Sequence, residues 1–205
     1  MLALDLRDGF DVRDPGAWER VGAVELACLN AGVTTREHDI RSVSDHAYRR
    51  IVGANVDGVV FGVRRLAAIQ EPGSAIVITA SLAGLVAAPQ DPLYTLTKHA
   101  VVGFVRSVAP QLAERGIRIN AVAPGFVDTP LLGDEARARF VAAGFPLLQP
   151  EEVGHAILTA ARSDDTGRIW VVQPGREPVQ FRFANVPGAR DPSGAAVGVP
   201  PLGTA

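Results

Sequence analysis

Residues 75–81 read Ala-Ile-Val-Ile-Thr-Ala-Ser, and residues 93–98 read Leu-Tyr-Thr-Leu-Thr-Lys. The run over 75–79 is apolar and β-branched, which predicts a buried strand. Ser81 follows it closely, and a hydroxyl at the carboxyl end of a strand faces the crevice where α/β sheets bind ligands. A buried strand followed by a long helix is one step of an alternating α/β fold. This stretch therefore indicates both a fold class and the place of a site.

Tyr94 and Lys98 stand four residues apart in a helix predicted over residues 93–115. Side chains at this spacing lie on one face of a helix. A phenol releases its proton only near pH ~10 in water, so it needs a nearby positive charge to act as an acid or base at neutral pH. The Lys98 ammonium can supply that charge, although a Tyr–Lys pair taken alone is more often a surface contact.

Strand-like and helix-like segments alternate along the rest of the chain. The pattern predicts strands at 2–6, 10–12, 26–30, 75–80, 117–122 and 168–172, and helices at 15–22, 44–68, 93–115 and from 150 onward. Ser44 and Asp45 offer N-cap side chains for the second helix. Strands separated by helices imply parallel βαβ units with right-handed crossovers. The expected fold is α/β with a doubly wound parallel sheet.

The chain divides into one domain and a tail. Residues 1–184 carry the alternating pattern, whereas residues 185–205 are rich in Pro, Gly and Ala and have no periodicity. Such a composition favours a flexible segment. With 205 residues, 47% of them hydrophobic, the chain is long enough to bury a core.

Composition argues against several classes of partner. The net charge is -2 without a basic cluster, so neither nucleic acid nor an anionic membrane surface is expected. No apolar run approaches the ~18 residues of a membrane span, and acidic residues interrupt the N-terminus, which is unlike a signal peptide. We expect a cytoplasmic protein. Cys28, the single cysteine, is expected in the core, and the histidines show no metal-ligand spacing, so no metal is expected.

Several motifs, in order, resemble the short-chain dehydrogenase/reductase family over residues 5–172. Asp11-Val12 is similar to the family's adenine contact, Asn30-Ala31-Gly32 to its Asn-Ala-Gly turn, and Asn55 to its catalytic asparagine in mid-helix. Ser81, Tyr94 and Lys98 match the other catalytic residues. The segment Pro124-Gly125-Phe126-Val127-Asp128-Thr129 resembles the border of the nicotinamide site, with Val127 and Thr129 at cofactor contacts.

The resemblance implies a Rossmann-like fold and an NAD(P)-dependent exchange between a secondary alcohol and a ketone. Tyr94 would transfer the proton, Lys98 would lower its pKa and hold the ribose, and Ser81 would hydrogen-bond the substrate oxygen. Asn55 would hold a water. Asp5, at the end of an early strand, would favour NAD over NADP. Relatives pair through helices like those at 44–68 and 93–115, so a homodimer or homotetramer is expected, with a small apolar alcohol or carbonyl substrate.

Some of these residues also have purely structural explanations. Asn30 and Gly32 tolerate left-handed backbone and could serve only the turn. Asp11 could cap the segment that follows it. Asparagine is a poor helix former, so Asn55 favours the water-holding role.

The sequence departs from the family at its start. It lacks the strand, the Thr-Gly-x-x-x-Gly-x-Gly turn and the helix that bind the pyrophosphate, so the sheet is expected to be incomplete at the N-terminus. The strand at 26–30 would then be an apolar edge. Two hypotheses follow: the chain is part of an oxidoreductase, or it is a catalytically silent remnant that acts only through dimerisation.

Overall fold

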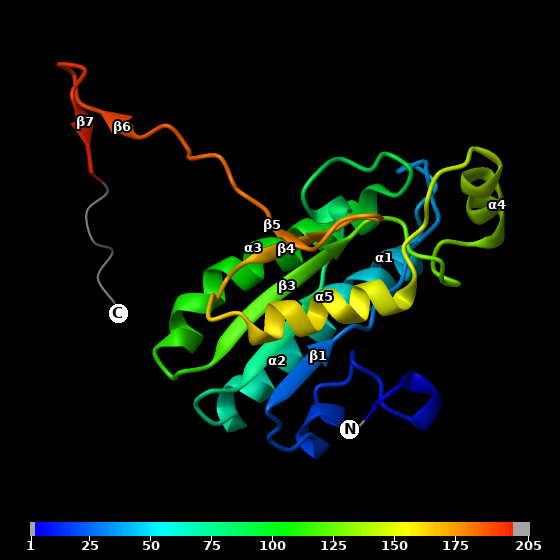
Figure 1. Ribbon diagram of the computed structural model, residues 1–205, viewed down its shortest axis with the longest axis horizontal. Coiled ribbons are helices and arrows are strands. Elements are labelled where there is room, and N and C mark those ends of the chain that lie inside the picture. The colour runs from blue at the N-terminus through cyan, green and yellow to red at the C-terminus, as the bar shows by residue number, and fades with distance from the viewer. Residues whose placement is uncertain (1–2, 199–205) are drawn as a thin grey trace.

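A five-stranded sheet forms the centre of the computed structural model, which describes residues 3–198. The strand order is β1-β2-β3-β4-β5. The strands are β1 (Leu26–Leu29), β2 (Ala75–Thr79), β3 (Arg118–Pro124), β4 (Ile169–Val172) and β5 (Val179–Gln180). The first four are parallel, and β5 pairs with β4 antiparallel. The α/β prediction is confirmed (Figure 1).

Helices cover both faces of this sheet. The helices of the described chain are α1 (Asp45–Val52), α2 (Gly58–Ile69), α3 (Pro92–Ala113), α4 (Asp134–Ala142) and α5 (Pro150–Arg162), with short 3-10 turns η1 (Leu6–Asp8), η2 (Ala17–Arg20) and η4 (Leu82–Gly84); α4 has no buried residue and does not cover the sheet. Residues of α2 and α3 share one apolar cluster with the sheet, and residues of α5 share another. Figure 1 shows α5 in front of the strands and α2 and α3 behind them.

Strand β2 shows why the central strands read as a continuous apolar run. Ile76 and Ile78 pack on the face covered by α2 and α3, whereas Ala75 and Val77 pack on the face covered by α5. All four side chains are buried. A strand with both faces covered needs apolar residues at every position, not only at alternate ones.

Strand β1 lies at one edge of the sheet, as expected. Within residues 3–198 its ladder partner is β2 alone. The expectation that Cys28 lies in the core is wrong, because its side chain is exposed while its neighbour Ala27 is buried. Cys28 projects to the face opposite Ala27, next to Val77. Its partial burial raises the pKa of the thiol.

The strands predicted at 2–6 and 10–12 are absent from the described part of the chain. Asp5 instead caps η1 by accepting a hydrogen bond from the Arg7 amide, and Gly9 ends this turn with φ +77°. Trp18 in η2 is buried and packs against Phe10 with perpendicular rings. A strand needs backbone hydrogen bonds to a neighbouring strand. The backbone groups of this segment form local hydrogen bonds within their own turns instead.

The C-terminal segment leaves the sheet after β5 (Figure 1). It contains a small antiparallel pair, β6 (Ala189–Arg190) and β7 (Ala196–Val197), that the sequence did not predict. Residues 199–205 of the predicted flexible tail lie outside the described residues. Between residues 3 and 198, no helix combines the length and apolar character that crossing a bilayer requires.

Candidate active site

The carboxyl ends of β1, β2 and β3 bring the predicted catalytic residues to one edge of the sheet. Asn30 follows β1, Ser81 follows β2 and Pro124 ends β3. The hydroxyl of Thr79 donates to Asn30 Oδ1 at 2.8 Å and so links the first two strand ends. This edge is where α/β sheets bind ligands.

Ser81 is half-buried and held by a local turn. Its backbone is extended, and its Oγ accepts a hydrogen bond from the Ala83 amide at 3.1 Å as the N-cap of η4. Gly84 in this turn lies against α3, since a Cβ there would be 2.6 Å from the Lys98 carbonyl oxygen. The close approach fixes the turn that carries Ser81 relative to the helix that carries Tyr94.

Tyr94 and Lys98 lie on α3 as the spacing predicts. The Lys98 Nζ is 5.5 Å from the centre of the Tyr94 ring and donates to the Thr79 carbonyl oxygen at 2.8 Å. The Lys98 side chain is buried, which lowers its pKa to about 8.

The expectation that Lys98 lowers the pKa of Tyr94 is not met in this structure. Burial raises the pKa of the phenol, the hydroxyl of Ser81 opposes that rise, and the charge of Asp91 adds to it. Burial has the largest effect because the phenolate loses more hydration free energy than one hydrogen bond from a hydroxyl restores. Tyr94 is therefore protonated at neutral pH and suited to donate a proton.

Asn55 lies in a π-helical segment, η3 (Gly53–Asp57), that interrupts the single helix predicted over 44–68. Its Oδ1 accepts from the Val33 amide, and its Nδ2 donates to the Val33 carbonyl oxygen and to Thr97 Oγ1. π-Segments occur often at functional sites because the extra residue redirects a side chain. Asn55 thus joins the loop after β1 to α3, and its water-holding role stays a prediction.

The turn Asn30-Ala31-Gly32 lies beside these residues. A Cβ at Gly32 would be 3.4 Å from Asn55 Oδ1 and 3.5 Å from Lys98 Nζ, so a side chain there would cover the ammonium. Neither Asn30 nor Gly32 adopts positive φ, and the turn explanation based on left-handed backbone is wrong.

The segment after β3 borders the same edge. The Gly125 amide donates to the Val172 carbonyl oxygen, and Val127 forms an isolated bridge to Leu148. Val127 and Thr129 are both partly buried. Their predicted cofactor contacts stay predictions.

Asp5, Asp11 and Val12 make structural contacts of their own. Asp5 is exposed on η1 and not on a strand, so the geometric basis for its role in NAD choice is lost. Asp11 pairs with Arg13 at 2.7 Å and accepts from its amide, which is the capping alternative. The Val12 side chain packs on Gly58, where a Cβ would approach it to 2.8 Å.

Sequence reasoning missed an aromatic cluster beside the site. Phe126, directly after Gly125, packs against Phe140 of α4 at 4.3 Å between ring centres, and both contact Phe145. The Asp128–Arg137 ion pair ties α4 to the same segment. Three phenylalanines within a mostly apolar segment of twenty residues were a visible signal, but the pattern gave no reason to join residues 126 and 145.

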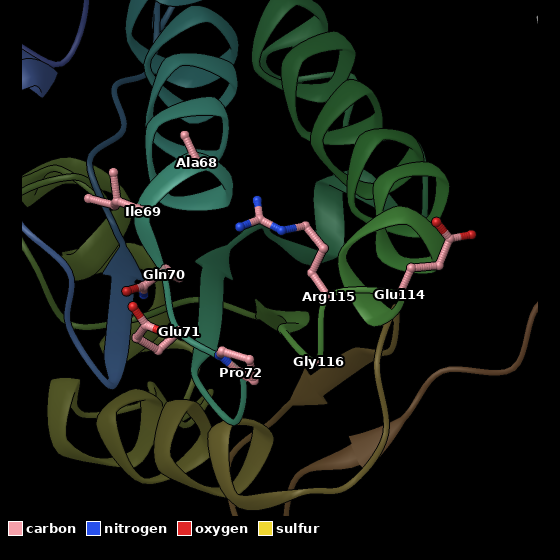
Figure 2. A pocket seen from close by; sticks show the side chains of 8 residues that line it. All are labelled: Ala68, Ile69, Gln70, Glu71, Pro72, Glu114, Arg115 and Gly116. Atoms are coloured by element: carbon pink, nitrogen blue, oxygen red, sulfur yellow. The ribbon is translucent and has the colours of Figure 1, made fainter.

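A cavity of about 570 Å³ lies at the opposite end of the sheet. It is lined by residues 68–72, before β2, and 114–116, before β3, as Figure 2 shows. The Arg115 guanidinium donates to the Ala67 carbonyl oxygen, and Gln70 Oε1 accepts from the Val24 amide. These bonds hold the end of α2 against the segments next to α3 and β1. The cavity lies at the amino ends of the strands, whereas Tyr94 lies near their carboxyl ends, so the cavity is remote from Tyr94.

The comparisons with known proteins agree with this geometry. A family profile described as enoyl-(acyl carrier protein) reductase matches residues 15–175. Cyclohexanol dehydrogenase from Acinetobacter sp. (strain SE19) is 36% identical over 160 residues, covering 74% of this chain and 63% of that protein. Cis-4-hydroxycyclohexanecarboxylate dehydrogenase from Sinomonas cyclohexanicum is 35% identical over 165 residues, covering 75% and 66%. The chain belongs to the short-chain dehydrogenase/reductase family.

Solved structures show the same fold. A 3-ketoacyl-(acyl-carrier-protein) reductase from Brucella melitensis complexed with NADH has a TM-score of 0.69 at 27% identity, with 81% of this chain and 76% of that chain covered. ElxO with NADP bound has a TM-score of 0.66 at 24% identity, with 79% and 74% covered. Several curated relatives are matched over less than two thirds of their own length, for example 63% of the cyclohexanol dehydrogenase and 43% of zerumbone synthase from Zingiber zerumbet.

Proposed function

We propose that this chain carries the catalytic half of an NAD(P)-dependent oxidoreductase that interconverts a secondary alcohol and a ketone. The observation that carries the proposal is the convergence of Ser81, Tyr94 and Lys98 at the carboxyl edge of the sheet. Ser81 and Tyr94 offer two hydroxyl groups to one substrate oxygen, and Lys98 places a cation behind the phenol. Membership of the family supports the same chemistry.

The residues at this edge fit the nicotinamide half of the cofactor. Gly32 leaves the space above the Lys98 ammonium open, and Val127 and Thr129, in the segment that follows β3, would contact the nicotinamide. When bound, the nicotinamide supplies or accepts the hydride. Lys98 would hold the ribose hydroxyls, while Tyr94 donates its proton to the substrate oxygen and Ser81 stabilises the charge that develops there.

The pyrophosphate half of the cofactor has no matching residues in the described part of the chain. The segment before β1 consists of 3-10 turns tied by local ion pairs and contains no glycine-rich turn. We propose a nicotinamide dinucleotide as cofactor without a preference between NAD and NADP, because Asp5 no longer supports one.

The substrate that we propose is a small cyclic, largely apolar alcohol. Phe126, Phe140 and Phe145 form an aromatic surface beside the Pro124–Thr129 segment, with Phe126 and Phe145 about half exposed. An aliphatic ring buries well against such a surface. Two similar proteins are named for cyclohexanol and for a hydroxycyclohexanecarboxylate, which supports a cyclic substrate.

Calorimetric titration with NAD and NADP tests this proposal. The chain is compared with a version that carries an added strand, glycine-rich turn and helix at its N-terminus, followed by turnover assays with cyclohexanol. Binding and turnover by the extended version, abolished by Tyr94→Phe, would support the proposal. A failure of both versions to bind either cofactor would favour the silent remnant.

A homodimer through α2 and α3 is proposed by analogy with relatives. Of the apolar stripe on α3, Val101, Val102 and Val105 are buried in this chain's own core, so they give a dimer no support. Phe104 and Val108 are partly buried and remain available at the surface. Sedimentation of the purified chain decides the oligomeric state.

A further inference from the structure

The carboxylate of Asp91 accepts more hydrogen bonds than a helix cap requires. Its Oδ1 accepts from the Tyr94 amide at 2.9 Å and from the Thr35 hydroxyl at 2.7 Å. Its Oδ2 accepts from the amides of Thr35 at 2.9 Å and Arg36 at 3.2 Å. One side chain therefore joins the first turn of α3 to the loop after β1.

Another helix of the same chain shows what capping alone needs. Ser44, the N-cap of α1, accepts one hydrogen bond, from the Ala47 amide, and that helix begins normally. A serine at position 91 would cap α3 in the same way. The remaining bonds of Asp91 thus serve the loop over residues 34–36.

A charged carboxylate at this position also disfavours ionisation of the Tyr94 phenol. Burial alone would raise the pKa of Asp91, but the bonds from Tyr94, Thr35 and Arg36 hold it below its ordinary value, so the group is charged at neutral pH. That negative charge disfavours the Tyr94 phenolate. A neutral N-cap residue would not raise the pKa of Tyr94. The presence of a carboxylate therefore indicates that its hydrogen bonds to the loop over residues 34–36 have a function of their own.

Those bonds hold Arg36 in an unfavourable backbone conformation. Its φ is +58°, and in the part of the chain that the structure describes no other non-glycine residue has positive φ. Such a conformation persists only where surrounding contacts impose it. In this conformation the Arg36 guanidinium donates to the Pro130 carbonyl oxygen at 3.0 Å and lies over Gly133. Both Pro130 and Gly133 precede α4.

We propose that Asp91 is a positioning residue that aligns Tyr94 with the segment over residues 130–133, through Arg36. The proposal rests on the proposed function, because it assigns Tyr94 the proton transfer. Residues 130–133 connect the β3 end, next to the nicotinamide border, to α4 and its aromatic cluster. When that segment is in place, Arg36 and Asp91 hold the backbone of Tyr94 in its reactive position.

The test uses Asp91→Ser, Arg36→Ala and their combination, assayed in the version that turns over cyclohexanol, with Ser44→Ala as a control. Asp91→Ser keeps the cap on Tyr94 and releases the loop. It also removes the charge that raises the pKa of Tyr94, a change that favours ionisation of the phenol, so a fall in kcat would come from the lost positioning. We expect kcat to fall about tenfold or more with the KM for cofactor within about twofold, since small misplacements of a catalytic group lower the rate. Arg36→Ala should lower kcat as well, and the double variant should lose no more than the larger single effect.

Ser44→Ala should reduce thermal stability without lowering kcat. The proposal is overturned if Asp91→Ser keeps kcat within about twofold of the parent, or if the effects of the two substitutions multiply as independent changes would.

Amide hydrogen exchange separates this inference from the proposed function. If the parent protein turns over no alcohol, the proposed function fails, but the clamp is still measured by exchange. Asp91→Ser should increase exchange in segments 34–36 and 130–133 together. Faster exchange confined to 34–36 would show that Asp91 does not reach the second segment and would overturn the inference.

Discussion

The Lys98 ammonium donates to the carbonyl oxygen of Thr79, the last residue of β2, at 2.8 Å. The bond fixes the cation at the carboxyl end of β2, two residues before Ser81. Lys98 is also the only lysine in the sequence, where arginine supplies every other basic side chain. Lysine, unlike arginine, shifts its pKa readily on burial, so the one position that uses it is the one where a titrating cation matters.

Burial of Lys98 predicts a specific pH dependence of stability. Its pKa is about 8 in the folded chain against 10.5 unfolded, so between these values the unfolded chain binds more protons and stability rises with pH. The gain is roughly 3 kcal/mol at 1.36 kcal/mol per pKa unit. Lys98→Met should remove this rise. Urea unfolding of both proteins at pH 7.5 and pH 10 measures the difference.

The single lysine makes the pKa itself measurable. Selective isotope labelling of lysine gives one side-chain NMR signal, and its titration should centre near pH 8. A midpoint close to 10.5 would show that water reaches the ammonium in solution and would remove the expected stability difference. The thiol of Cys28, whose pKa is raised by partial burial, is a second group whose ionisation could change stability with pH, so Cys28→Ser in both proteins serves as the common background.

Tyr94→Phe should abolish turnover while leaving the fold intact. The ring stays in place, and only the hydroxyl that would transfer the proton is lost, which lowers the rate by about 10²- to 10⁴-fold. Tyr48, the only other tyrosine, is about half exposed and far along the chain, so Tyr48→Phe is the matched control and should keep full activity. Equal losses in the two variants would contradict the assignment.

Asn55→Ala should destabilise the protein by about 2 kcal/mol. The substitution removes the two bonds of Asn55 to the Val33 amide and carbonyl oxygen, and because Val33 is only partly buried, each lost bond costs about 1 kcal/mol. Thr97→Val removes the bond from Asn55 Nδ2 to Thr97 and the bond from the Thr97 hydroxyl to the Tyr94 carbonyl oxygen, but leaves both Val33 groups paired, and should cost about 1 kcal/mol. Denaturant unfolding of the two variants checks the order, and a larger loss in Thr97→Val would contradict it.

The sequence predicted the central sheet and the helical placement of Tyr94 and Lys98 because both depend on local patterns. The run at 75–79 is apolar throughout since both its faces are covered, and Tyr94 and Lys98 obey helical spacing. Asp91 and Pro92 form a helix-start signature, an N-cap residue followed by proline at the first helical position. That signature places the start of α3 at Pro92, one residue before the predicted start.

Other features depend on contacts that no local pattern contains. The bond from Arg36 to Pro130 spans 94 residues. The exposure of Cys28 depends on the position of its strand at the sheet edge. The π-segment at Asn55 adds one residue per turn without changing the apolar pattern, and Asp5 was assigned to a strand that had no neighbour to pair with.

Gly62 of α2 lies where the N-terminal segment packs closely on that helix. A Cβ at this position would lie 2.6 Å from the ring of Trp18 and 3.0 Å from Leu29, and the buried ring has no free space to move into. Gly62→Ala should therefore destabilise the protein by about 1–3 kcal/mol, despite the better helix propensity of alanine.

Gly103 in α3 provides the matched control. It is also within a helix, but a Cβ there would meet no atom within 4 Å. Gly103→Ala should stabilise the protein by up to about 1 kcal/mol, because only the helix propensity changes. Thermal unfolding of both variants gives the sign of each effect. A stabilising Gly62→Ala would mean that Trp18 does not pack on α2 in solution, and that residues 10–21 are held to the domain by other contacts, such as the bonds of Arg65 to Val21 and Glu19 and the packing of Val12 on Gly58.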